Sequence, residues 1–255
     1  MEKRFVGKVA LVTGATNGIG QATAVRLAAE GALVGVNQRP TGDPGETLRR
    51  IKEVGGRGFP VVADMRNPEQ VIEMVQEVAS RGGRLDYVVS NAAINPFMKW
   101  DETSLEDFDR LSETNFRGTW VVCTESAKQM IKSGHGGAIV IVSSISAHVA
   151  APMQVAYCGT KAAVSMLGKA LGSVLGDHGI RVNVIEPGSV RTNMGKQLFD
   201  IPEVEKYYKD RIPLHRIGEP EELAGAIAFM LSNDASYITS AALLVDAGFM
   251  VNAEL

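Results

Sequence analysis

The sequence predicts an α/β fold, in which a doubly wound parallel sheet is flanked by helices. Short runs rich in Val, Ile and Ala alternate along the 255 residues with longer segments of helical period. These runs are apolar throughout rather than at every second position, which is typical of strands covered on both faces. A glycine-rich turn also follows the first run directly. Repeated strand–helix units of this kind form a parallel sheet with right-handed crossovers.

The elements follow one another in a regular order. The helical patterns are longer than the apolar runs and separate them. The expected strands are Val9–Thr13, Leu33–Val36, Gly58–Val62, Tyr87–Ser90, Ala138–Ser143, Val182–Ile185 and Leu243–Val245. The expected helices are Ile19–Glu30, Gly45–Val54, Pro68–Arg81, Leu105–Ser133, Met153–Asp177 and Glu219–Leu231.

No internal repeat, low-complexity tract or Pro/Ser-rich linker divides the sequence, so we expect a single domain over residues 1–255. The loop Pro40–Gly45 follows the second strand and is no domain boundary. The segment Pro187–Pro213 contains no clear strand and carries glycines and a proline. Long excursions of this kind in compact domains are often lids, so we expect a substrate lid over residues 188–215.

Composition excludes several classes of protein. The chain is 45% hydrophobic and 22% charged with a net charge of −3, and a nucleic-acid or membrane partner would favour clustered Lys and Arg. No signal peptide or run of about 18 apolar residues is present. The two cysteines are too few for a disulfide framework, and the four histidines lack metal-ligand spacing. We expect a cytoplasmic protein that binds no metal, nucleic acid or membrane.

The glycine-rich turn indicates a dinucleotide site. Gly14, Gly18 and Gly20 form a GxxxGxG pattern between the first strand and the first helix. Glycines permit a tight turn and a close approach of the backbone to a pyrophosphate at a helix N-terminus. A plain turn is the alternative interpretation, but the position at the first strand–helix junction favours binding.

A tyrosine and a lysine one helical turn apart indicate proton-transfer chemistry. Tyr157 and Lys161 lie at positions i and i+4 and therefore share one helical face. A free tyrosine has a pKa of about 10, and a neighbouring ammonium is expected to lower it. Ser144, thirteen residues before Tyr157, ends the fifth strand at the edge where ligands bind in such sheets. Strand alternation directs the neighbouring Ser143 to the opposite face.

Together, the TGxxxGIG and YxxxK motifs resemble those of the short-chain dehydrogenase/reductase family over nearly the whole chain. The resemblance implies a Rossmann-type fold and a nicotinamide-dependent oxidoreductase. It also implies base-assisted hydride transfer, in which Tyr157 removes a hydroxyl proton and Ser144 holds the substrate oxygen. Lys161 and Asn115 would anchor a proton relay through water, so the implied catalytic residues are Ser144, Tyr157, Lys161 and Asn115.

Minor motifs of the family fall in order along the chain. Asn91-Ala92-Ala93 resembles the family's NNAG, and Pro187–Thr192 resembles its PGxxxT segment. Asp246-Ala247-Gly248 departs from its C-terminal DGG. The implied cofactor-binding residues are Gly14, Thr16, Asn17, Gly18, Ile19, Gly20, Gln38, Arg39, Asp64, Met65, Asn91, Ala92, Tyr157, Lys161, Pro187, Gly188, Val190 and Thr192.

The end of the second strand bears on the choice between NAD and NADP. An acid there would bind the ribose 2′-hydroxyl and repel a 2′-phosphate. Gln38 takes that place, and Arg39 could pair with a phosphate. Asn17 stands where NADP-preferring relatives often have a second basic residue, and a solvated loop arginine is the alternative for Arg39. NADP is slightly favoured, with use of both cofactors open.

Polar residues around the expected pocket favour a polyhydroxylated ligand, because each buried hydroxyl without a partner is costly. The expected substrate contacts are Asn95, Ser144, Ser146, Gln154, Tyr157 and Asn193. The second half of the chain is also similar to bacterial aldose 1-dehydrogenases of the L-rhamnose type. The similar segments are SSISA at 143–147, RIGEPEELAG at 216–225 and LLVDAGFMVN at 243–252.

This similarity implies oxidation of the anomeric hydroxyl of a sugar to a lactone. A 3-oxoacyl thioester reductase of the same family is the alternative. A non-catalytic dinucleotide-sensing module is the distant alternative, although a sensor needs no proton-transfer group. An apolar, small-residue stripe on the helix of Tyr157 suits a subunit contact, and family members are commonly tetramers, so we expect a homotetramer.

Overall fold

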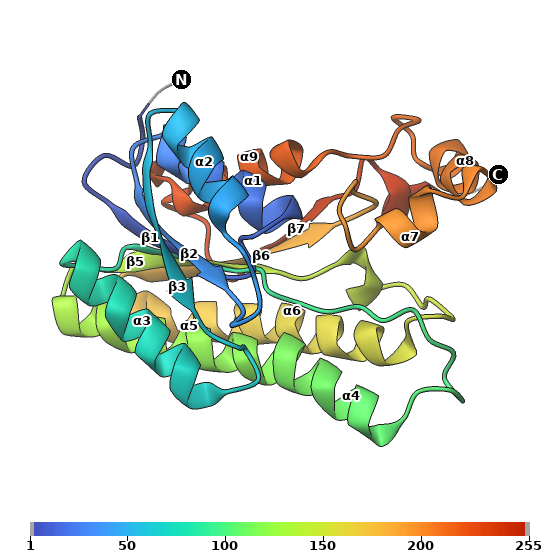
Figure 1. The fold of residues 1–255 in the computed structure, drawn as a ribbon, viewed down its shortest axis with the longest axis horizontal. Coiled ribbons are helices and arrows are strands. Elements are labelled where there is room, and N and C mark those ends of the chain that lie inside the picture. The colour runs from blue at the N-terminus through green and yellow to red at the C-terminus, as the bar shows by residue number, and fades with distance from the viewer. Residues whose placement is uncertain (1–2, 253–255) are drawn as a thin grey trace.

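A seven-stranded sheet forms the centre of the computed structural model, which describes residues 3–252 (Figure 1). All neighbouring strands pair in parallel, in the order β3-β2-β1-β4-β5-β6-β7. The strands are β1 (Val9–Val12), β2 (Leu33–Gln38), β3 (Arg57–Val62), β4 (Tyr87–Ser90), β5 (Gly137–Val142), β6 (Ile180–Pro187) and β7 (Ala242–Val245). The predicted doubly wound parallel sheet is thereby confirmed.

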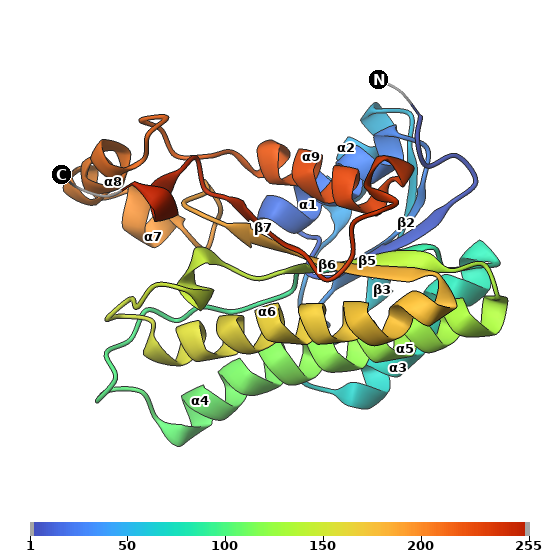
Figure 2. The same ribbon diagram turned by 180° about the vertical axis from the view of Figure 1, so that it is seen from behind.

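Helices cover both faces of this sheet. Figures 1 and 2 show α1, α2 and α9 on one face and α3, α4, α5 and α6 on the other. The first layer comprises α1 (Gly18–Ala29), α2 (Gly45–Glu53) and α9 (Pro220–Leu231). The opposite layer comprises α3 (Pro68–Gly82), α4 (Leu105–Ser112), α5 (Gly118–Ser133) and α6 (Val155–Leu175). Short 3₁₀ turns occupy Ile145–Ala147, Gly176–His178, Asn233–Ala235 and Phe249–Val251.

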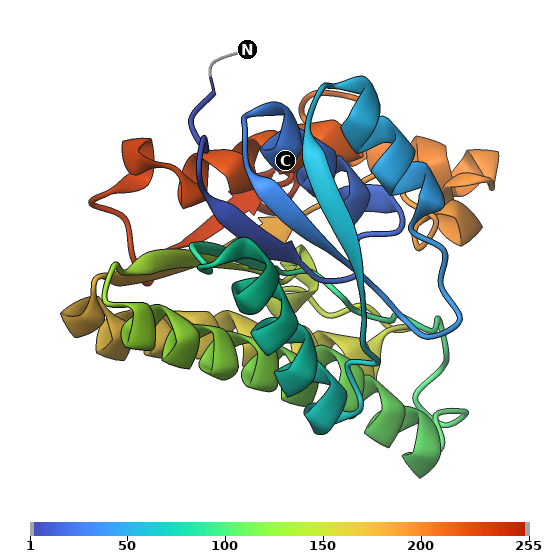
Figure 3. The same cartoon turned by 60° about the vertical axis from the view of Figure 1, so that its left-hand side comes forward.

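Two apolar cores lie between the sheet and its helix layers. Figure 3 shows the two helix layers on opposite sides of the sheet. Successive strand residues point to opposite faces. In β1, Val12 therefore packs in the core under α1 and α9, whereas Leu11 packs in the core against α3 and α5. Both residues are fully buried. This two-sided burial explains why the strands are apolar throughout.

Two segments differ from the expected elements. The predicted helix Leu105–Ser133 is divided by a π-helical turn over Glu113–Arg117, which separates α4 from α5. The segment after β6 is not irregular throughout, because it contains two helices, α7 (Lys196–Phe199) and α8 (Pro202–Arg211). Pro202 begins α8 at a position where the missing proline N–H costs nothing.

The strand order reverses between β1 and β4, whose following connections lead to opposite faces of the sheet. In open α/β sheets, a crevice forms outside the carboxyl ends of the strands at this switch point. The fold thus brings together the turns after β1, β4, β5 and β6. No helix among residues 3–252 is both long enough and apolar enough to span a bilayer.

Candidate active site

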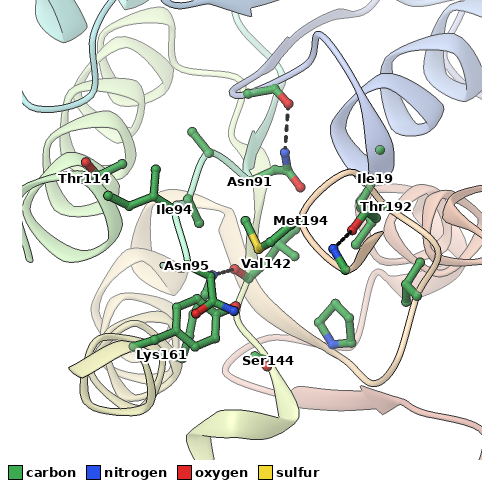
Figure 4. A pocket seen from close by; sticks show the side chains of 18 of the residues that line it. Ile19, Asn91, Ile94, Asn95, Thr114, Val142, Ser144, Lys161, Thr192 and Met194 are labelled. Carbon is green, nitrogen blue, oxygen red and sulfur yellow. Dashed lines mark hydrogen bonds between the residues drawn. The ribbon is translucent and has the colours of Figure 1, made fainter. Parts of the chain in front are cut away.

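A cavity of about 580 Å³ opens at this switch point. The side chains of Asn91, Asn95, Ser144 and Lys161 on its wall are drawn in Figure 4. Nearly all residues proposed from the sequence line this cavity. They are Gly14, Thr16, Asn17, Gly18, Ile19, Gln38, Arg39, Asp64, Met65, Asn91, Ala92, Asn95, Ser144, Ser146, Gln154, Tyr157, Lys161, Pro187, Gly188, Val190 and Thr192. Gly20, Asn115 and Asn193 do not line it.

The glycine turn leaves no room for side chains. Gly14 has a φ of +60°, and a Cβ atom on it would lie 2.8 Å from the Cα atom of Ala92. A Cβ atom on Gly20 would lie 2.3 Å from the carbonyl oxygen of Gly14. Gly20 therefore permits the close approach of α1 to the turn instead of facing the cavity. A cradle that such atoms would fill fits a pyrophosphate held at the N-terminus of α1.

Asn37, at the end of β2, holds the glycine turn and was not predicted. The backbone N–H of Gly14 donates to Asn37 Oδ1 at 3.0 Å, and the backbone N–H of Ala15 donates to the Asn37 carbonyl at 3.0 Å. Its own Nδ2 donates to the carbonyl of Ala63 at 3.3 Å. A polar residue in a buried strand next to a glycine turn was the available signal.

The loop after β4 is tied to β1. Asn91 Nδ2 donates to the carbonyls of Thr13 and Gly14 at 3.0 and 3.1 Å. Thr13 Oγ1 accepts from the backbone N–H groups of Asn91 and Ala92 at 2.9 and 3.0 Å. These bonds explain why the chain has a threonine before Gly14 and an asparagine after β4.

The end of the cavity beside β2 and β3 contains a neutral amide, Gln38, and a carboxylate paired with an arginine, Asp64. Gln38 Oε1 is buried and has no hydrogen-bond partner among the described residues. Asp64 accepts two bonds from Arg66 Nε at 3.1 Å and one from Arg66 Nη2 at 2.7 Å. These bonds hold the pKa of Asp64 below its usual value, against the effect of partial burial. Arg66 lines the cavity beside Arg39 and was missed from the sequence.

The two adjacent serines after β5 have different surroundings. Ser143 Oγ donates to the Lys161 carbonyl at 2.8 Å, and both residues are buried. Ser144 begins the 3₁₀ turn Ile145–Ala147, and its Oγ accepts from the Ser146 N–H at 3.0 Å. Ser144 also hydrogen-bonds the Tyr157 hydroxyl. The hydroxyl that meets Tyr157 is thus that of Ser144, as strand alternation suggests.

Tyr157 and Lys161 lie together on α6 and are both buried. Lys161 Nζ is 5.6 Å from the Tyr157 ring centroid and donates to the Val142 carbonyl at 2.9 Å (Figure 4). Burial lowers the pKa of Lys161 to about 8. Burial also raises the pKa of Tyr157 above its usual value, although the Ser144 hydrogen bond opposes this rise. Among the chain's own groups, loss of water therefore outweighs the hydrogen bond, and a lowered phenol pKa beside an oxidised nicotinamide stays a prediction.

Asn115 lies behind the cavity wall rather than on it. The π-helical turn directs its amide to the loop after β4, where Oδ1 accepts from the Ile94 N–H and Nδ2 donates to the Ile94 carbonyl, both at 2.9 Å. Nδ2 also donates to Thr160 Oγ1 at 3.2 Å. Asn115 thus fixes the Ile94 loop to α6. Its role in a proton relay stays a prediction.

The substrate end differs from the expectation in one residue. Asn193 is exposed and lines a separate groove of about 300 Å³ near Arg50, because the chain turns after Thr192 and directs Met194 into the main cavity instead. Asn95 Oδ1 is buried, and no donor in the described part of the chain reaches it. An unpaired buried acceptor in a cavity is suited to a ligand hydroxyl.

Apolar side chains complete the wall. They come from the loop after β4, from the segment between β6 and α7, and from α7 and α8, and they are Ile94, Phe97, Met194, Leu198, Phe199 and Tyr208. The helical pattern after Pro202 was the signal that could have placed the last of them. Within residues 3–252, no cluster of three or more His, Cys, Asp or Glu could hold a metal ion.

Comparisons with known proteins agree with this geometry. A family model described as enoyl-(acyl carrier protein) reductase matches residues 14–250. The L-rhamnose 1-dehydrogenase (NAD(P)(+)) of Sphingomonas sp. (strain SKA58) is 39% identical over 251 residues, 98% of this chain and 99% of that protein. The glucose 1-dehydrogenase of Gluconobacter oxydans (strain 621H) is 35% identical over 246 residues, 96% of this chain and 92% of that protein.

A solved structure is similar over the same length. The gluconate 5-dehydrogenase from Burkholderia cenocepacia J2315, crystallised with NADP and tartrate, has a TM-score of 0.92 at 30% identity and covers 98% of this chain and 99% of that one. The resemblance inferred from the two motifs is thereby confirmed. The chain belongs to the short-chain dehydrogenase/reductase family of NAD(P)-dependent oxidoreductases.

Proposed function

We propose that the chain is an aldose 1-dehydrogenase, which oxidises the anomeric hydroxyl of an L-rhamnose-like sugar to its lactone with NAD or NADP. One observation carries the proposal. A single cavity contains the glycine turn, the Ser144–Tyr157 pair, Lys161 and the unpaired acceptor of Asn95. The names of the relatives at 39% and 35% identity support a sugar substrate.

The residues present fit a dinucleotide. The turn at Gly14 would hold the pyrophosphate, and Pro187–Thr192 would lie along the nicotinamide. The unpaired Gln38 Oε1 is suited to accept from a ribose hydroxyl, and the exposed Arg39 is suited to a 2′-phosphate. A neutral Gln38 repels neither form, so we propose that both cofactors are used.

The chain's own residues would manage the proton. Tyr157 takes the proton of the anomeric hydroxyl, while Ser144 donates a hydrogen bond that favours the phenolate. A nicotinamide held in this cavity would supply the hydride acceptor, so that loss of the hydroxyl proton to Tyr157 and of the hydride on the anomeric carbon would leave the lactone carbonyl. Lys161, whose pKa of about 8 leaves it mainly charged at neutral pH, attracts the phenolate from the next turn of α6.

The substrate wall would discriminate between sugars. Asn95, Ser146 and Gln154 offer partners for ring hydroxyls. The apolar Met194 and Leu198 offer no partner, which suits the methyl group of a 6-deoxy sugar better than a hydroxymethyl group. Because these two residues come from residues 188–215, we propose that this segment is the substrate lid.

The test is a panel of L-rhamnose, D-glucose and a 3-oxoacyl thioester, assayed with both NAD⁺ and NADP⁺ or with their reduced forms. We expect reduction of both cofactors by aldoses, with L-rhamnose preferred to D-glucose. Turnover of the thioester and none of the aldoses would instead identify an acyl reductase. Cofactor binding without turnover of any substrate would indicate a sensing module.

We also propose that four copies of the chain assemble. An apolar groove of about 650 Å³ runs between α4 and α6, where Leu105 is 83% exposed and Phe108 is 47% exposed. Exposed apolar patches of this kind mark interaction sites, and α6 carries Tyr157 on its other side. Light scattering should give four times the chain mass of 27.2 kDa, and Phe108→Glu should lower it. A wild-type monomer would contradict this proposal.

A further inference from the structure

A buried carboxylate lies at the end of β6, where the strand pattern calls for an apolar residue. Val182 and Val184 point to the α6 side of the sheet and pack in its core. Strand alternation directs Glu186 to the same side, at the edge that carries the active site. Only 2% of its surface is exposed. A buried carboxylate costs several kcal/mol unless it is well partnered, so its partners bear on its role.

Both carboxylate oxygens of Glu186 are engaged by other elements. Ser165 Oγ donates to Oε1 from α6. His148 Nε2 lies 2.9 Å from Oε2, and the His148 side chain is 40% exposed. Ser165 is one helical turn after Lys161 on the same face of α6. Glu186 thus links β6 to the helix that carries Tyr157 and Lys161.

The histidine ends the turn that Ser144 begins. Ser144 Oγ accepts from the Ser146 N–H at 3.0 Å, and the His148 N–H donates to the Ile145 carbonyl at 2.9 Å. Ser144 at the start of the turn hydrogen-bonds Tyr157, and His148 at its end hydrogen-bonds Glu186. A shift of His148 would therefore be transmitted to Ser144 over one turn of chain.

We propose that Glu186 is a positioning residue for the reaction, which holds the Ser144–His148 turn at a fixed distance from α6 through His148 and Ser165. Glu186 does not line the cavity, so it acts through Ser144 and not on the substrate. The inference rests on the proposed function for the role of Ser144. A displacement of about 1 Å at a reacting group costs about a hundredfold in rate, which sets the scale of the effect.

Glu30 provides a matched control. Its carboxylate is also buried, with 1% of the side chain exposed, and it accepts from Arg4 Nε at 2.6 Å and from Arg4 Nη2 at 2.9 Å. It follows α1, which runs away from the glycine turn, so it lies at the other end of the sheet. Loss of this carboxylate perturbs a buried ionic cluster without touching the active-site turn.

The experiment compares Glu186→Ala, Glu186→Gln and Glu30→Ala with the wild type. We expect Glu186→Ala to lower kcat by about ten- to a hundredfold with little change in cofactor Kd, because only the alignment of Ser144 with Tyr157 is lost. Glu186→Gln should recover most of the rate, since an amide can accept from Ser165 and donate to His148. Glu30→Ala should lose stability and keep kcat.

Hydrogen exchange gives a readout that needs no substrate. The Ser146 and His148 amides should exchange at least about tenfold faster in Glu186→Ala than in the wild type, and at the wild-type rate in Glu186→Gln. If kcat and exchange in Glu186→Ala match those of Glu30→Ala, the positioning role is refuted. If the turn loosens in Glu186→Ala but the wild type oxidises no aldose, the proposed function fails. The structural role of Glu186 in holding the Ser144–His148 turn then still stands.

Discussion

Replacement of Lys161 with methionine should stabilise the fold while it abolishes turnover. The lysine is 4% exposed, and burial lowers its pKa from 10.5 to about 8. That difference corresponds to about 3 kcal/mol of unfolding free energy at pH 7. Methionine is similar in length and carries no charge, but it leaves the Val142 carbonyl without the donor at 2.9 Å. That loss costs about 1–2 kcal/mol, so a net gain of about 1–2 kcal/mol remains.

The gain in unfolding free energy of Lys161→Met should decrease as pH rises. Below pH 8 both the folded and the unfolded lysine hold a proton, so the full cost of burying the charge is present. Between pH 8 and 10.5 the folded lysine is neutral while the unfolded lysine is still charged, so wild-type stability rises with pH. The advantage of methionine is therefore largest near neutrality and disappears by pH 10.5.

Urea denaturation at pH 7 and at pH 10 measures this difference. Lys128→Met, at an exposed position on α5, is the control and should show no comparable change with pH. A Lys161→Met protein that is less stable than the wild type at pH 7 would refute the reasoning. An advantage that does not shrink at pH 10 would refute it as well.

Further variants test individual contacts. Gln38→Asp should lower kcat/KM for NADP⁺ at least about tenfold and leave that for NAD⁺ nearly unchanged, because a carboxylate repels the 2′-phosphate. Ser144→Ala should lower kcat by about 10²–10³, whereas Ser143→Ala should keep kcat and lose about 1 kcal/mol of unfolding free energy. Asn95→Leu should raise KM for the sugar about tenfold and not that for the cofactor, in steady-state assays. Ala247→Gly should raise the unfolding free energy by up to about 1 kcal/mol, because Ala247 has a φ of +54°; a loss of stability would contradict this explanation.

The elements of the fold were predictable because their signals are local. Each strand is a continuous apolar run that the two helix layers bury. Each helix repeats its apolar residues with the period of an α-helix. The π-helical turn was not predictable, since the helical period continues through Leu105–Ser133. It is set by the tertiary bonds of Asn115 to the Ile94 loop. The same bonds hold the Asn115 side chain behind the cavity wall.

The active site was predictable where spacing alone fixes geometry. Tyr157 and Lys161 share a face because of helical periodicity, and Ser144 differs from Ser143 because of strand alternation. The pKa of Tyr157 depends on burial, which spacing does not encode. Asn193 was placed in the main cavity, whereas Met194 lines it, because the direction of a side chain in an irregular segment depends on the packing of α7. Glu186 was missed because a single acid in an apolar strand does not disclose its partners.

The account's central claim is that Tyr157 transfers the proton during aldose oxidation. The most direct measurement is the rate of L-rhamnose-dependent reduction of NADP⁺ by Tyr157→Phe, compared with the wild type at equal saturation with cofactor. Phenylalanine keeps the ring and removes only the hydroxyl that meets Ser144. We predict a rate lower by about 10²–10⁴ with an unchanged cofactor Kd. A variant that turns over at the wild-type rate would contradict the account.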